Sequence, residues 1–257
     1  MKSKAQVTVF IILAIFIVAA IALLFIFKND LPISTGGKPA QNPDAFFETC
    51  IQEKIKDTAD LISIQGGYAK PELFFDFKFE DEESQKISYL CYNQNYYLPC
   101  INQEPMLLEH LKDELYREIK FDMKNCFDDL SKALSKKGYS VDATYNDFEI
   151  TLAPKKIIVD IFGQFILTKS GETTTQKDFR VIVPTHFYDN AVVAQEIISQ
   201  EARFCSFDQT GFMLLNPEFN INKFRTSDST TIYTIENRDS KEKFRFAVRS
   251  CVIPPGI

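Results

Sequence analysis

The longest uninterrupted hydrophobic run lies near the start of the chain. Residues 7 to 27 read VTVFIILAIFIVAAIALLFIF, with no charged side chain and with Thr8 as the one polar residue. A helix of about 21 residues rises roughly 31 Å, which matches the hydrocarbon core of a bilayer at about 30 Å. The pattern predicts a transmembrane helix over 7–27 that inserts in a lipid bilayer, preceded by a short basic leader over 1–6.

A cleaved secretory signal is the alternative interpretation of this run. Residues 20 to 22 read AIA, which is typical of a cleavage site, and cleavage after Ala22 would release a secreted protein. Five further apolar residues follow without a break, whereas the apolar region of a signal usually spans about 7 to 15 residues and then turns polar. A retained anchor is therefore favoured. Lys2 and Lys4 precede the span and favour a cytoplasmic N-terminus, with the rest of the chain outside.

The apolar period changes twice in the next hundred residues. Residues 28–43 contain three prolines and a glycine pair without a hydrophobic period, which predicts a linker. From Asp44, apolar residues recur every three or four positions until Gly66, and the same helical spacing returns over 105–137, either as one helix or as two broken within 120–125. Between them, 73–79 and 87–92 alternate as paired strands. We expect 44–138 to form a helix, hairpin, helix unit.

After residue 138 the chain changes to strand-like alternation. Strands are predicted over 140–143, 148–152, 156–167, 179–183, 212–215, 219–224, 230–236 and 244–252, and one helix over 190–204. The expected class is therefore α+β, with residues 139–257 forming a mostly antiparallel sheet packed with one helix. The pattern leaves open whether this unit is separate from 44–138 or forms one ectodomain with it.

Composition narrows the class of protein. At 45% hydrophobic and 25% charged residues the chain is too apolar for a disordered protein. Its 29 basic and 35 acidic side chains give a net charge of -6, whereas a nucleic-acid binder needs an excess of Lys and Arg to displace counterions from phosphates. We therefore expect no nucleic-acid partner.

All six cysteines follow the apolar span, and no two have the Cys-x-x-Cys spacing of a zinc or redox site. Disulfides in an oxidising exterior are favoured over free buried thiols in a cytosolic domain. Cys91 and Cys100 bracket a turn, two others lie on or beside the apolar stripes of the predicted helices, and the last two would tie a helix to the final strand. The predicted pairs are Cys50 with Cys126, Cys91 with Cys100, and Cys205 with Cys251.

Motifs for catalysis, cofactors and metals are absent from the sequence. It contains no phosphate-binding glycine loop, no Gly-x-Ser-x-Gly and no His-Glu-x-x-His. His110 lies within a predicted helix and His186 lies at a strand end, where functional sites commonly form, but a structural role is favoured for both. The acidic runs 80–83 and 128–129 lack the spacing of a calcium loop and are interpreted as solvated surface. We predict that the protein is not an enzyme and that it binds no cofactor and no metal.

The N-terminus resembles a known class of signal. Residues 4 to 10, KAQVTVF, are similar to the class III signal of archaeal type IV pilin-like proteins. The resemblance implies that a prepilin peptidase cuts between Ala5 and Gln6 and leaves the apolar helix at the new N-terminus. At the position where that family usually carries Glu, this chain has Phe10. Residues 65–68 (QGGY) and 244–247 (FRFA) also resemble segments of uncharacterised single-pass envelope proteins of small-genome archaea.

Two classes of function follow. The first is a single-pass, membrane-anchored cell-envelope protein whose extracytoplasmic domain binds a partner or is part of a surface structure, with envelope or pilus-like proteins as partners. The alternative is the ligand-binding ectodomain of a sensor or transport system that acts with a separate membrane partner. A hydrolase ranks third because no nucleophile motif is present.

Overall fold

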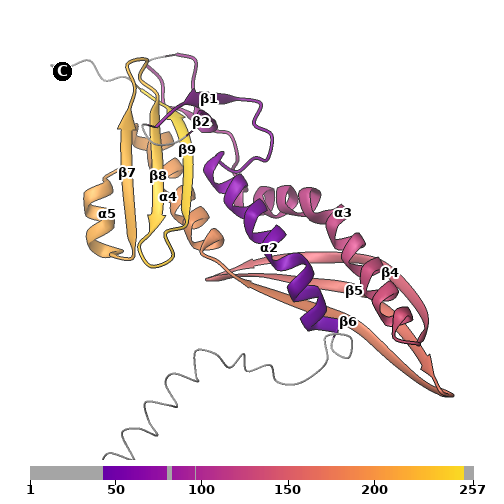
Figure 1. Ribbon diagram of the computed structural model, residues 1–257. Coiled ribbons are helices and arrows are strands. Elements are labelled where there is room, and N and C mark those ends of the chain that lie inside the picture. The colour runs from indigo at the N-terminus through magenta and orange to yellow at the C-terminus, as the bar shows by residue number, and fades with distance from the viewer. Residues whose placement is uncertain (1–42, 80–82, 96, 252–257) are drawn as a thin grey trace, which may run out of the picture. The chain divides into compact units, whose positions relative to one another are not determined.

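The computed structural model describes residues 43–79, 83–95 and 97–251, which belong to one compact unit (Figure 1). The predicted leader, transmembrane segment and most of the linker lie outside the described residues, as does the cleavage site at Ala5 and Gln6. No helix among the described residues combines the length and the apolar character that crossing a bilayer requires.

The fold is α+β, and its first half closely follows the hydrophobic pattern. The elements are α2 (Pro43–Ile64), β1 (Phe74–Phe77), β2 (Gln85–Tyr92), β3 (Ile101–Asn102) and α3 (Leu107–Lys136). Helix α3 continues without a break through residues 120–125, because its apolar stripe keeps the helical period across them. The predicted hairpin is present as an antiparallel β1–β2 pair.

In the second half, one of the predicted strands is a helix. Its elements are β4 (Ser140–Ala153), β5 (Lys156–Lys169), β6 (Glu172–Pro184), α4 (Phe187–Phe204), α5 (Gln209–Leu215), β7 (Phe219–Arg225), β8 (Thr231–Asn237) and β9 (Lys243–Arg249). Residues 212–215 are helical rather than a strand. The Asp208 side chain accepts a hydrogen bond from the Gly211 N–H at 3.0 Å and caps α5, while a four-residue apolar run by itself does not distinguish helix from strand.

The strands form two sheets instead of the single C-terminal sheet that the pattern predicts. One sheet is antiparallel with the order β4-β5-β6, and it merges the two strands predicted over 140–143 and 148–152 into β4 by a bulge between Tyr145 and Asp147. The other has the order β1-β2-β9-β8-β7, with β3 beside β2 and a parallel β2–β9 pair. The N-terminal hairpin is thus built into the sheet of the C-terminal half, and strand pairing crosses residue 138.

Helices α2 and α3 cover one face of the β4-β5-β6 sheet, and α4 packs against β8 and β9 (Figure 1). The centre of the first core is Phe127 of α3, which is 2% exposed and stacks on Phe165 of β5 at 4.3 Å between ring centroids. Its ring also contacts Phe47 and Tyr145. A side chain at Gly163 would bring its Cβ within 2.8 Å of the Phe127 ring, so this close approach of helix and strand requires glycine.

Three disulfides tie these layers together, and they join the same pairs that the sequence predicts. Cys50 is bonded to Cys126 between α2 and α3, with Cα atoms 6.0 Å apart. The other two bridges link Cys91 to Cys100 at 5.2 Å and Cys205 to Cys251 at 5.5 Å. All six cysteines lie within the described residues, and none of them is free.

A buried carboxylate stabilises the junction of α4 with the second sheet. Glu201 is 3% exposed, accepts a hydrogen bond from Tyr233 Oη and lies 3.3 Å from Lys223 Nζ. Burial raises the pKa of Tyr233 and the neighbouring Glu201 charge raises it further, so the hydroxyl stays neutral and acts as the donor. These contacts satisfy a charge that would otherwise be costly to bury.

Candidate functional site

A polar depression among the described residues is a cleft of about 560 Å³. It lies where the loop after α2 meets the first turns of α3 and the β2–β3 region. Side chains of opposite charge and two aromatic rings line it, among them Tyr68, Lys70, Glu72, Tyr89, Glu104, His110 and Arg117. We call this depression the polar cleft.

The wall of the polar cleft follows from local sequence. His110, Glu114 and Arg117 have spacings of four and three residues, which place them on one face of α3. Opposite them, Gly66 and Gly67 have positive φ angles of 75° and 96° and reverse the chain after α2. The Gly67 N–H donates to the Ile62 carbonyl at 2.8 Å, as expected where a helix ends in this conformation.

His110 is held in one orientation within the polar cleft. Its Nε2 is 2.9 Å from the Gly67 carbonyl, and because a carbonyl can only accept, Nε2 carries the hydrogen. Its Nδ1 faces Glu104 Oε2 at 3.8 Å. Tyr68 Oη donates to the other Glu104 oxygen, and burial together with this carboxylate raises the pKa of Tyr68, which therefore stays neutral.

Glu114 fixes the loop to the helix. One carboxylate oxygen accepts the Ala69 N–H at 2.9 Å, and the other pairs with Arg117 one turn later on α3. This arrangement positions the residues of the QGGY segment against α3. The polar cleft thus presents rigid groups of both charges and is suited to a small polar ligand with both an acidic and a basic group.

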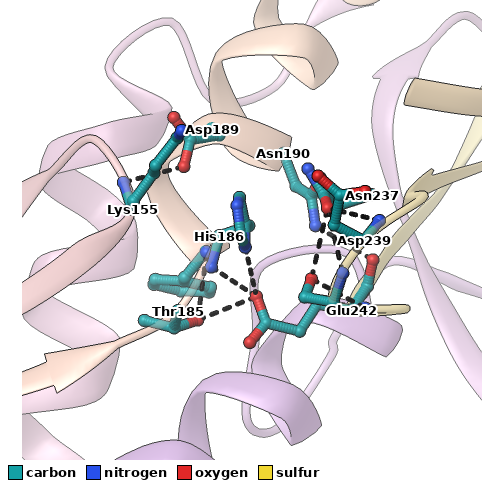
Figure 2. Close-up of polar contacts among 10 residues, drawn as sticks. Lys155, Thr185, His186, Asp189, Asn190, Asn237, Asp239 and Glu242 are labelled. Atoms are coloured by element: carbon teal, nitrogen blue, oxygen red, sulfur yellow. Dashed lines mark hydrogen bonds and ion pairs between the residues drawn. The ribbon is translucent and has the colours of Figure 1, made fainter. Parts of the chain in front are cut away.

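His186, which the sequence placed at a strand end, lies in a second polar cluster (Figure 2). Glu242, from the β8–β9 turn, accepts hydrogen bonds from the Thr185 hydroxyl at 3.1 Å and from the His186 backbone N–H. Its Oε2 is 3.6 Å from His186 Nδ1, beyond hydrogen-bond distance. The Asn190 amide nitrogen donates to the Glu242 carbonyl at 3.2 Å. These contacts attach the β6–α4 junction to the β8–β9 turn.

Two buried polar atoms of this cluster have no hydrogen-bond partner among the described residues. They are His186 Nδ1 and the side-chain oxygen of Asn190, a residue that is 1% exposed. Burial raises the pKa of nearby Asp60, and the Glu242 charge raises it further. The groups bonded to Glu242 are a hydroxyl and amides rather than a base and its nucleophile, so the arrangement positions the two sheets and does not form a Ser-His or Cys-His pair.

The remaining candidates from the sequence do not come together. Within the described ranges, no group of three or more His, Cys, Asp or Glu side chains is arranged to hold a metal ion. Asp129 pairs with Lys132 at 2.9 Å on the surface of α3. Most of the acidic run 80–83 lies outside the described residues.

The sequence placed His110 within a predicted helix and favoured a structural role for it, and it did not show the partners of this histidine. The spacing of His110, Glu114 and Arg117 on one helix face was a usable signal for the wall of the polar cleft. Tyr68 ends the QGGY segment and Glu104 lies in a separate loop, and no local pattern relates the two residues. Glu242 lies in a turn without any motif, so its contacts with His186 become visible only in three dimensions.

Comparisons with family models, with curated proteins and with solved structures gave no match to this chain. Its function is therefore inferred from its residues and their geometry alone.

Proposed function

We propose that the chain is a single-pass, membrane-anchored cell-envelope protein whose disulfide-bonded domain lies outside the cytoplasm and has a binding or structural role. The observation that carries the proposal is the pairing of all six cysteines. Such bridges persist in oxidising compartments and are rare in the cytosol, where thiols are kept reduced. The apolar segment 7–27 and the basic residues before it supply the anchor and the orientation. Its partners would be envelope or pilus-like proteins.

The topology can be tested on intact cells that express the full chain. We expect added protease to remove the domain while the membrane retains an N-terminal fragment, and we expect alkylation of the denatured, unreduced protein to label no thiol. N-terminal sequencing of that fragment then separates a start at Gln6, which supports prepilin processing, from a start at Met1. Lysed cells are the control for protease activity. If the domain is protected until lysis and carries six free thiols, the domain lies in the cytoplasm.

The polar cleft favours a second candidate function, the binding of a small zwitterionic ligand for a sensor or transport system. Lys70 and Arg117 offer cations, and Glu72 and Glu104 offer carboxylates, within one depression. A ligand that binds the native state alone stabilises it by about 2.7 kcal/mol at 100 times its Kd.

Thermal unfolding of the full chain with each of the common free amino acids tests this candidate. We expect at least one of them to raise Tm, and we expect Lys70→Met to reduce that shift. Lys156→Met, on the exposed end of β5, is the control and should keep it. If no amino acid changes Tm, or if Lys70→Met responds like wild type, the zwitterion hypothesis is wrong.

A further inference from the structure

The β4-β5-β6 sheet has a second face, opposite α2 and α3, which we call the open face. Alternation along β5 places its even-numbered residues on this face, where apolar Ile158, Phe162 and Ile166 alternate with polar Asp160 and Gln164, while the odd-numbered residues point to the helices. Phe162 is 39% exposed, and Ile182, beside Ile158 on β6, is 42% exposed. Apolar side chains therefore alternate with polar ones along the central strand, and Phe162 and Ile182 are in contact with solvent.

The two edge strands carry opposite charges on the open face. Strand β4 contributes Asp142 and Glu149, and β6 contributes Lys177 and Arg180. In the sheet register, Glu149 is opposite Asp160 on β5, and Asp160 is opposite Arg180, which donates from Nε to its carboxylate at 2.5 Å. The face thus has an acidic edge, a central strand on which apolar and polar side chains alternate, and a basic edge.

We propose that the open face is an interface between two copies of this chain, related by a two-fold axis that runs parallel to the strands. Rotation about that axis places β4 of one copy over β6 of the other, so that Glu149 of each copy faces Arg180 of the other. It also brings the two Asp160 carboxylates near the axis, where each is paired with Arg180 of its own copy. An axis across the strands would place β4 over β4 and oppose acid with acid. The charge pattern therefore selects the parallel arrangement.

The size of the open face is sufficient for a specific dimer. The thirteen paired positions of β4 and β5 extend about 44 Å at roughly 3.4 Å per residue, and three strands are about 14 Å wide, which gives about 600 Å² per copy. Two copies would bury about 1,200 Å², at the lower end for specific interfaces. A hollow of about 510 Å³ at the bulge between β5 and β6, lined by Phe162 and Phe179 together with Asp160, Asp178 and Arg180, offers room for the Phe162 ring of the second copy.

The direction of the chains supports the same symmetry independently of the charge pattern. This second argument rests on the proposed function. An axis parallel to the strands leaves Pro43, the start of α2, at the same end in both copies. This arrangement suits two chains that are anchored through residues 7–27 in one bilayer. The charge pattern and the anchor therefore indicate the same symmetry, and the charge pattern does so wherever the domain lies.

The proposal is tested with the full chain in the membranes of expressing cells. A photoreactive phenylalanine (p-benzoylphenylalanine) at position 162 should give a covalent species of twice the chain mass. The control carries the same group at Phe121 of α3, which is 73% exposed but lies on the opposite side of the sheet, and it should give about one tenth of that yield or less. Equal yields from both positions, or no dimer from position 162, would overturn the interface.

Charge reversal then tests the symmetry. Glu149→Arg and Arg180→Glu each place like charges opposite each other in the homodimer, so we expect each variant alone to lose roughly tenfold in cross-linking. A dimer of one variant with the other has both attractive pairs again, so we expect a mixture of the two to recover the wild-type yield. Such recovery also shows that both variants fold. Failure to recover, with each variant unfolding as cooperatively as wild type, contradicts the parallel arrangement. Because cross-linking reports dimers on either side of the membrane, its outcome is independent of the topology experiment.

Discussion

Replacing Phe127 by alanine is expected to lower the free energy of unfolding by about 3 to 5 kcal/mol. The ring is almost fully buried and contacts Phe165, Phe47 and Tyr145, so its removal takes away the common contact between α3, α2 and the β4-β5-β6 sheet. Gly163 leaves a flat strand surface beneath the ring, and no side chain there can move in to fill the cavity. Because the chain has no Trp, unfolding is best followed by tyrosine fluorescence and circular dichroism in denaturant.

Phe121→Ala is the matched control for this experiment. It removes the same side chain from the same helix, six residues earlier, at a position that is 73% exposed. We expect a change within about 0.5 kcal/mol, as for most surface substitutions. If the two variants lose similar stability, Phe127 is not the centre of this core.

The sequence predicted the three long helices and most strands because burial imposes a period on each element. The apolar stripe of α3 and the alternation of β5 are both visible in the order of apolar and polar residues. The parallel pairing of β2 with β9 was not predictable in this way, because it joins Tyr89 to Ala247 and no local pattern specifies a partner so far along the chain. The short α5 was misread for a different reason: its cap at Asp208 lies before an apolar run of only four residues.

In the candidate sites, too, the sequence shows some features and only the structure shows the others. His110 was visible as a histidine in a helix, but the contacts that orient it come from Gly67 and Glu104 in other elements. The opposite charges of β4 and β6 on the open face depend on the register and on two bulges, and a shift of one residue would move each side chain to the other face. Periodicity therefore predicts which residues are buried, whereas the register decides which exposed residues are neighbours.

The disulfides should contribute unequally to stability. Removing the Cys50–Cys126 bridge by a double alanine substitution is expected to lower the free energy of unfolding by about 4 kcal/mol, because it closes a loop with a sequence separation of 76 and ties α2 to α3. Removing the Cys91–Cys100 bridge, with a separation of 9, is the control and should lower it by about 2 to 3 kcal/mol. Double substitutions avoid a leftover thiol that could exchange with the other bridges.

Denaturant unfolding of both variants measures the difference, and non-reducing peptide mapping of the wild-type chain establishes the pairing on which it depends. We expect mapping to recover three linked peptide pairs, with Cys91 joined to Cys100 within its own hairpin region. A Cys50 peptide linked to any cysteine other than Cys126 would contradict the packing of α2 against α3. If the variant without the Cys91–Cys100 bridge were the less stable of the two, restriction of the unfolded chain would not be the main effect, and the bridge at β2 would instead contribute through the native contacts of Cys91, which is fully buried.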